Sequence, residues 1–266
     1  MRDKRTVIGQ IAYGLAITGL TAGAFFMPIT LTGGLEIPLS AVESRSYTMQ
    51  SPSAAERKST AVKLSQGTLP ERFPRTDAWN LILVNPWHPI PEDYTVTLRD
   101  LGNGQAVDER CYEDLEAMLT DCRTAGLQPR ICSSYRTQET QQALYQNKIK
   151  RLIRQGYSQQ QAETEAAKVV AFPGTSEHQL GLALDIVDQQ YQILDTKQEE
   201  TAVQQWLMEN SWKYGFVLRY PNGKSDITGI IYEPWHYRYV GRQAAEQMQE
   251  LELCLEEYLE LLSGED

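Results

Sequence analysis

Two segments that lie far apart in the chain each place a histidine beside carboxylates. The first, residues 174–185, reads GTSEHQLGLALD and holds His178 and Asp185. The second reads Glu-Pro-Trp-His and runs from Glu233 to His236. The whole sequence has only three histidines, and two of them stand in these segments. Packing alone gives no reason for this concentration, so the fold must bring both segments to one place.

The pattern of apolar residues predicts an α+β domain in which strands from distant parts of the chain form one small sheet, with helices outside it. Helical spacing and capping residues predict helices over residues 108–125, from Thr137 past Leu152, 158–171 and 199–214. Short apolar runs rich in branched residues predict strands over residues 128–134, 181–187, 216–220 and 233–239.

A final helix is predicted over residues 242–262, with an apolar stripe on one side that would dock on the domain. Its opposite side is acidic, which disfavours an anionic membrane surface as a partner. We interpret this acidic side as a solvated charged face, formed by Glu250, Glu256, Glu257 and Glu260.

The N-terminus predicts export from the cytoplasm. Three basic residues among the first five precede an apolar stretch that extends from Val7 to about Leu31. Its length is closer to a membrane span of about 20 residues than to the apolar core of a cleavable signal. We therefore expect a signal-anchor, or alternatively a cleaved signal peptide, over residues 1–33, with the rest of the chain on the extracytoplasmic face or secreted. A polar, flexible stalk is expected over 34–78, and the folded domain over 79–266.

Charge and cysteine content exclude other classes of function. A net charge of -10 argues against nucleic acid as a partner, because binding to it requires a basic surface. The four cysteines contain no Cys-x-x-Cys pair of the kind that holds a metal. They are compatible with an oxidising compartment, but their pairing stays open.

The two opening segments supply the ligands of a catalytic zinc site, which needs three protein ligands and one open position. His178, Asp185 and His236 form such a set, although other first-row metals would bind it as well. On a strand, Asp185 would point away from its apolar neighbours, and Gly181 would let the chain turn sharply before it. Glu233 could then stay off the metal and act as the general base.

A third segment, residues 133–137, is the best candidate for holding a substrate. It reads Ser-Ser-Tyr-Arg-Thr and lies at the junction of a predicted strand and helix. The planar guanidinium of Arg136 could hold a terminal carboxylate or stabilise an oxyanion. Gln141 is close enough in sequence to share this pocket, although a lone glutamine there would ordinarily be a solvated helix residue. Ser176, two residues before His178, could hydrogen-bond the substrate or merely stabilise the loop.

Together these residues closely resemble the VanY-like D-alanyl-D-alanine carboxypeptidases among the zinc D-peptidases. The resemblance rests on the Ser-x-Tyr-Arg element, on Ser-x-His-x-x-Gly-x-Ala-x-Asp at residues 176–185, and on EPWHYRYVG at residues 233–241. It implies a compact domain with a small, mostly antiparallel sheet. The implied ligands of Zn2+ are His178, Asp185 and His236, with Glu233 as base and acid, and with Arg136, Gln141 and Ser176 contacting substrate.

The expected activity is hydrolysis of the C-terminal D-Ala-D-Ala bond of peptidoglycan stem peptides by water activated at zinc. An L,D-carboxypeptidase that trims stem tetrapeptides is the nearest alternative. An endopeptidase is disfavoured, because Arg136 would then face an internal amide. A non-catalytic wall-binding module with a structural zinc is the alternative from another class, against which Glu233 argues.

Overall fold

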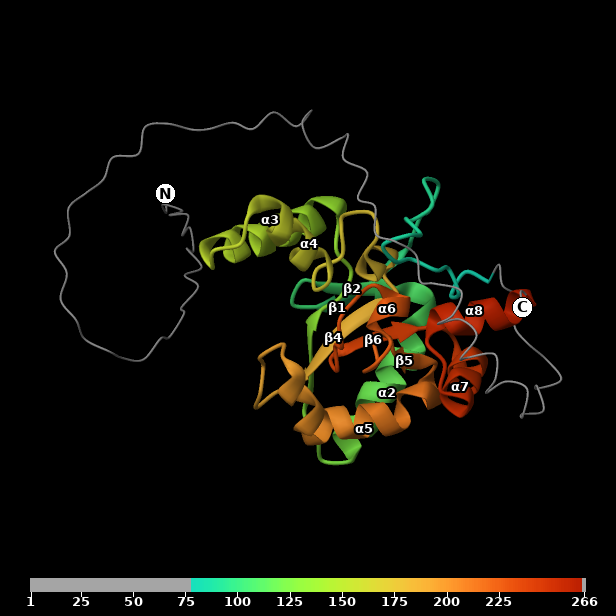
Figure 1. Ribbon diagram of the computed structural model, residues 1–266. Helices are drawn as coiled ribbons and strands as arrows, with labels where there is room; N and C mark the ends of the chain where they lie inside the picture. Colours follow the sequence, from blue (N-terminus) through green and yellow to red (C-terminus); the bar gives the residue numbers. More distant parts are fainter. Residues whose placement is uncertain (1–77, 265–266) are drawn as a thin grey trace, which may run out of the picture. The chain divides into compact units, whose positions relative to one another are not determined.

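The computed structural model describes residues 78–264, drawn in colour in Figure 1. The predicted anchor (1–33) and the predicted stalk (34–78), apart from its last residue, lie outside the described residues. The described part has an α+β fold with small antiparallel sheets flanked by helices, as predicted. Within residues 78–264, no helix combines the length and the apolar character needed to cross a membrane.

The main sheet has four strands in the order β3-β4-β6-β5, and every neighbouring pair is antiparallel. Its strands are β3 (Pro129–Ser133), β4 (Ala183–Asp188), β5 (Phe216–Leu218) and β6 (His236–Tyr239). All four were predicted, with longer bounds except that β4 extends one residue past its predicted end, to Asp188. A separate hairpin joins β1 (Leu98–Gly102) to β2 (Gln105–Asp108). This hairpin was not predicted.

The helices are α2 (Tyr112–Thr124), α3 (Gln138–Arg154), α4 (Gln159–Ala167), α5 (Ala202–Asn210), the short α6 (Ser225–Thr228), α7 (Arg242–Leu251) and α8 (Leu255–Ser263). The Thr137 side chain caps α3, as predicted. Ser158 and Gln161 form a capping box that begins α4. The helix predicted over 199–214 is shorter, because its two ends are the 3-10 turns Thr196–Glu200 and Ser211–Tyr214.

The two faces of the sheet have different surroundings, because successive residues of a strand point to opposite sides. Leu184, Ile186 and Tyr237 belong to the larger apolar cluster, which also contains residues of α2 and α5. In Figure 1 these two helices lie together beside the sheet. Asp185 and His236 alternate with those residues and therefore project from the other face. The apolar core thus fixes the side on which the polar residues meet.

The prediction of one continuous final helix is wrong. The chain breaks at Glu252, which has a left-handed backbone (φ 54°) and ends α7. A new helix then begins, with Cys254 as its N-cap and Glu257 completing a capping box. The predicted docking stripe is confirmed, because Ala244, Met248 and Tyr258 are buried in a second apolar cluster.

The acidic side of this segment also differs from the prediction. Glu256 bonds to Arg219, and Glu257 bonds to Lys224, so neither is simply a solvated charge. Both partners come from the chain that follows β5, which amphipathic periodicity within one helix does not reveal.

The four cysteines are all within the described residues and are free thiols. Cys111, Cys122 and Cys254 are buried, whereas Cys132 is exposed. No disulfide therefore braces residues 78–264.

Gly181 occupies the turn between His178 and β4 for a steric reason. Its backbone is left-handed (φ +75°), and an added Cβ would lie 3.0 Å from the backbone nitrogen of Asp108. Gly181→Ala should therefore lower the free energy of unfolding by about 1 to 3 kcal/mol, measured by urea denaturation.

Gly223→Ala is the matched control for this prediction. Gly223 has a similar backbone (φ +79°), but an added Cβ there would meet nothing within 4 Å. Gly181→Ala should cost more than Gly223→Ala, and equal losses would contradict the importance of the close approach to Asp108.

Candidate metal centre

Antiparallel pairing places two of the predicted ligands next to each other. Asp185 on β4 is directly opposite His236 at the start of β6. On its other side Asp185 is opposite Ser133 of β3. His178 lies on the 3-10 turn Glu177–Leu180, which Gly181 ends just before β4. The strand register thus joins two segments that are distant in sequence.

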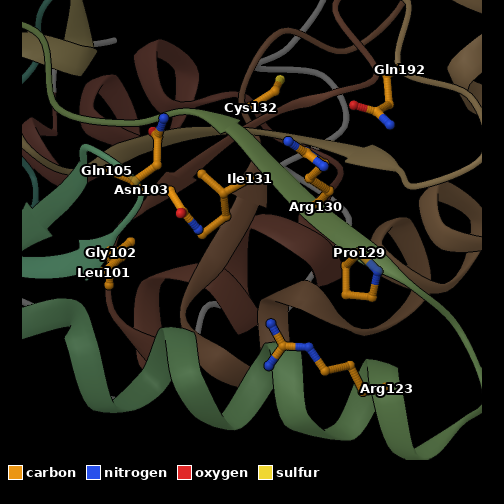
Figure 2. Close-up of a pocket in the computed structure, with 10 residues that line it drawn as sticks. All are labelled: Leu101, Gly102, Asn103, Gln105, Arg123, Pro129, Arg130, Ile131, Cys132 and Gln192. Carbon is orange, nitrogen blue, oxygen red and sulfur yellow. The ribbon is translucent and has the colours of Figure 1, made fainter. Parts of the chain in front are cut away.

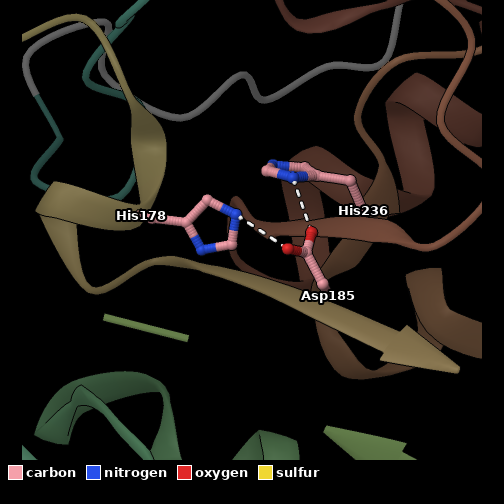
Figure 3. Close-up of side chains that lie close together, drawn as sticks. All are labelled: His178, Asp185 and His236. Atoms are coloured by element: carbon pink, nitrogen blue, oxygen red, sulfur yellow. Dashed lines mark hydrogen bonds and ion pairs between the residues drawn. The ribbon is translucent and has the colours of Figure 1, made fainter. Parts of the chain in front are cut away.

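The three ligand side chains converge. Figure 3 shows both imidazole rings directed at the Asp185 carboxylate. His178 Nε2 lies 3.4 Å from Asp185 Oδ2, and His236 Nδ1 lies 3.1 Å from Asp185 Oδ1. One ligand atom from each residue lies within 4.8 Å of the other two, and all three residues are buried. The arrangement has the residue types, spacing and burial of a metal site.

The orientation of His178 is fixed by the main chain. Its Nδ1 lies 2.8 Å from the carbonyl oxygen of Ser134, which accepts a hydrogen bond, so Nδ1 carries the proton. Nε2 is then the nitrogen that faces Asp185. Burial, together with the Arg136 charge, lowers the pKa of His178 to about 4. The ring is therefore neutral at physiological pH, as a metal ligand must be.

His236 and Asp185 are electrostatically coupled. Burial acts to lower the pKa of His236, but Asp185 and Glu177 outweigh it and raise the pKa to about 9. Burial likewise acts to raise the pKa of Asp185, but His178, His236 and Arg136 hold it well below its usual range. Asp185 is thus ionised, and a metal that binds His236 displaces a proton from the ring.

Glu233 lies beside the ligand atoms without belonging to their cluster. It precedes β6, whose strand begins only at His236, and its backbone nitrogen donates to Tyr220. Its Oε2 is 3.8 Å from His236 Nδ1. Burial raises the pKa of Glu233 to about 8, with the Asp185 charge adding to the rise and His236 opposing it. A carboxyl group with this pKa can both take up and release a proton near neutral pH.

Arg136 reaches the same carboxylate from the chain that follows β3. Its Nη2 donates to Asp185 Oδ2 at 2.8 Å, its Nε to Ser133 Oγ at 2.8 Å, and its Nη1 to Gln141 Oε1 at 3.3 Å. The side chain is 17% exposed, compared with 4% for the Asp185 and both histidine side chains. Of these groups, the guanidinium is the one most open to solvent.

The other two predicted substrate contacts have different surroundings. Gln141 is fully buried, and its Nε2 donates to the carbonyl of Ala171 at 2.7 Å. Because its Oε1 accepts from Arg136, the side chain orients that arginine. Ser176 is buried at the start of the turn that carries His178, and its side chain does not cap that turn. The structure brings Gln141 together with Arg136. The contacts of Gln141 and Ser176 with substrate stay predictions.

Several groups at the site were not predicted from the sequence. The ring of Tyr220 lies 4.7 Å from that of His236. Glu177 is buried between Arg219 and Arg238, and all three side chains are fully buried. Charged residues next to the motif histidine and within the predicted strands were the available signal, since a buried charge needs a partner.

A separate pocket lies along β3, as Figure 2 shows. Its volume is about 690 Å3, and its lining includes Arg123, Arg130 and Cys132. None of the predicted metal, catalytic or substrate residues lines it. The chemistry therefore points to the His-Asp-His cluster and not to this pocket.

The donor set fits zinc. Two imidazoles and one carboxylate are ligands that zinc takes in catalytic sites, and three protein ligands leave a position open. The three ligand atoms are already close together, and His178 is neutral with Nε2 turned inward.

Comparisons with known proteins agree with this assignment. The family model described as VanY, D-alanyl-D-alanine carboxypeptidase, matches residues 104–242. A D-alanyl-D-alanine carboxypeptidase of Enterococcus faecalis is 48% identical over 181 residues, which cover 68% of this chain and 66% of that protein. The match thus spans about two thirds of that relative's length.

Solved structures similar to this chain include two of VanY proteins. The vancomycin-resistance D,D-pentapeptidase VanY of a VanB-type cassette, solved as a mutant with Zn(II), is 45% identical, with a TM-score of 0.63 over 68% of this chain and 99% of that one. VanYB in complex with D-alanine-D-alanine is 46% identical, with a TM-score of 0.64 over 71% and 100%. The LD-carboxypeptidase LdcB is 33% identical, with a TM-score of 0.55 over 68% and 86%.

Proposed function

This chain belongs to the VanY family of D-alanyl-D-alanine carboxypeptidases, and we propose that it hydrolyses the C-terminal D-Ala-D-Ala bond of peptidoglycan stem peptides in a zinc-dependent reaction. The observation that carries the proposal is the convergence of His178, Asp185 and His236 next to the buried Glu233. Arg136, which can hold a terminal carboxylate, lies at the same site.

His178 through Nε2, His236 through Nδ1 and the Asp185 carboxylate would hold the zinc ion. When bound, zinc polarises the scissile carbonyl and makes water a stronger nucleophile at neutral pH. The protein contributes a neutral His178, an ionised Asp185 and a buried position that limits access of bulk water.

Glu233 moves the proton in this proposal. The attacking oxygen of water forms a bond to the carbonyl carbon, and Glu233 accepts the proton that water loses. When the carbon–nitrogen bond breaks, Glu233 gives that proton to the departing amine, so that D-alanine leaves as a neutral amine and the carboxyl returns to its starting state. Its raised pKa, about 8, suits both halves of this cycle.

Arg136 is suited to bind the terminal carboxylate because two of its N–H groups remain available as donors. A guanidinium has five N–H groups. Three of them bond to Ser133, Gln141 and Asp185, which leaves one N–H on each terminal nitrogen. Two such donors form the planar fork that binds a carboxylate on both oxygens. We therefore expect a preference for the end of a peptide over an internal bond.

A second candidate activity is cleavage of stem tetrapeptides by an L,D-carboxypeptidase. The similarity to LdcB supports it, because that protein is named an LD-carboxypeptidase. Zinc, base and arginine would serve both reactions equally, so the distinction depends on which residue precedes the cleaved D-alanine.

The first 33 residues bear on where the enzyme acts. We propose that this segment anchors the enzyme in the cell membrane with the domain on the extracytoplasmic face, where it meets peptidoglycan. The basic start and long apolar stretch of the sequence support this. Cell fractionation should find the intact chain in the membrane, with its domain sensitive to protease added to protoplasts. Full-length chain in the cytosol would contradict the proposal, and shortened chain in the medium would favour a cleaved signal.

Product analysis tests the reaction. The zinc-loaded full chain should release D-alanine from a stem pentapeptide that ends in D-Ala-D-Ala, and not from the tetrapeptide. A pentapeptide with a C-terminal amide should react much more slowly, because Arg136 loses its ionic partner. Folded, zinc-loaded protein that releases nothing from the pentapeptide would contradict the D,D activity, and binding without turnover would favour a wall-binding module. Release from the tetrapeptide alone would assign the L,D activity.

Glu233→Gln tests the proton transfer. The variant should lose about 100- to 10,000-fold in kcat, because the amide cannot take up the proton, while it still binds one zinc ion per chain. Asp226→Asn is the control, since Asp226 is an exposed carboxylate on the short helix α6 and should not affect the rate. Full activity of Glu233→Gln would remove Glu233 from the mechanism.

A further inference from the structure

Two buried polar atoms in the described part of the chain have no hydrogen-bond partner there, namely Glu177 Oε2 and His236 Nε2. They lie 3.6 Å from each other, slightly farther than a hydrogen bond. An unsatisfied buried polar group costs about 1 to 3 kcal/mol. A shift of the ring by a few tenths of an ångström would pair the two atoms and remove both costs. The packing thus directs them at each other.

The pairing would divide the two nitrogens of His236 between two tasks. Nδ1 lies 3.1 Å from Asp185 Oδ1, on the side of the other ligand atoms. Nε2 is turned away from them, toward Glu177. A histidine that binds a metal usually donates its other N–H to a carboxylate or a carbonyl, and this fixes the tautomer and the ring orientation. The carbonyl of Ser134 accepts this hydrogen bond from His178, and the carboxylate of Glu177 is placed to accept it from His236.

Glu177 is itself held on its other oxygen. Its Oε1 accepts hydrogen bonds from Arg219 Nε and Arg238 Nη1, each at 2.7 Å, and all three side chains are fully buried. Two arginines keep the carboxylate charged and fix its plane. Oε2 is left for His236.

Through Arg219, the contacts of Glu177 extend to the last helix. Arg219 bonds to both oxygens of Glu256 on α8, through Nη1 at 2.8 Å and Nη2 at 2.7 Å. The Glu256 side chain is 12% exposed. Glu256 also lies beyond residues 104–242, the range that the family model matches. Two arginines and two glutamates balance in charge, and they connect α8 to the ring of His236.

We propose that Glu177 is a positioning residue whose Oε2 accepts a hydrogen bond from the Nε2–H of His236 and so directs Nδ1 to the metal. Glu256 stabilises this arrangement by fixing Arg219. This inference rests on the metal role proposed above for His236 and deepens it. Part of the affinity for zinc therefore comes from a helix outside the matched family region.

Glu177→Gln separates this role from simple packing. A carboxylate accepts hydrogen bonds on both oxygens, whereas an amide accepts on one side and donates on the other. Glutamine cannot satisfy the two arginines and His236 at the same time. The zinc affinity of the full chain should fall about 10- to 100-fold, the usual effect of losing an outer partner of a metal ligand.

Glu256→Gln provides a second variant that does not touch a proposed ligand. It weakens the hydrogen bonds between residue 256 and Arg219. The zinc affinity should therefore also fall, but by a smaller factor than in Glu177→Gln. It also keeps the inference open to contradiction if Glu177→Gln does not fold.

Glu257→Gln is the matched control. Glu257 is the next residue on α8 and forms a partly buried ion pair with Lys224. This variant should lose stability while its zinc affinity stays unchanged. Asp185→Ala, which removes a proposed ligand, gives the upper limit for loss of affinity.

The measurement is a zinc competition titration against a chelating dye, on full-length protein that circular dichroism shows to be folded. The expected order of zinc affinity is wild type and Glu257→Gln first, then Glu256→Gln, then Glu177→Gln. If the folded Glu177 and Glu256 variants bind zinc as tightly as Glu257→Gln, the inference is overturned, and Glu256→Gln decides alone where Glu177→Gln is unfolded. Wild type that binds no zinc would instead overturn the proposed function, and this inference with it.

Discussion

The site depends on the antiparallel pairing of β4 with β6. This register sets Asp185 opposite His236, while Leu184 and Tyr237, next to them, face the apolar core. Because a slip of one residue would exchange the two faces of a strand, the same packing that stabilises the sheet also keeps the ligands together. A carboxylate and an imidazole that are distant in sequence thus meet on adjacent strands.

Buried charge is the second constraint, and it is met by pairing. Arg219 and Arg238 lie in the interior because Glu177 and Glu256 balance them. Removing one partner of a buried ion pair leaves a charge without compensation, which is strongly destabilising. The arrangement also limits the freedom of Glu177, whose second oxygen points to His236. The same contacts that satisfy the core therefore reach the site.

The sequence was sufficient to predict that His178, Asp185 and His236 converge, because each stands in a short motif with a chemical reason for its spacing. Apolar periodicity also predicted α2, α3 and the four strands of the main sheet. It did not reveal that the last helix breaks at Glu252. Nor could it reveal that Glu256 pairs with Arg219, since that pairing joins distant segments. For the same reason Glu177, although adjacent to His178, was not recognised as a partner of His236.

The central claim is that these residues have unequal roles, with three on the metal and Glu233 beside it. A crystal structure of the zinc-loaded protein, with anomalous scattering measured at the zinc edge, tests this most directly. The account predicts zinc bound by Nε2 of His178, by Nδ1 of His236 and by Asp185, with Glu233 not coordinated and Glu177 bonded to His236 Nε2. Coordination by Glu233, or by Nε2 of His236, would contradict it.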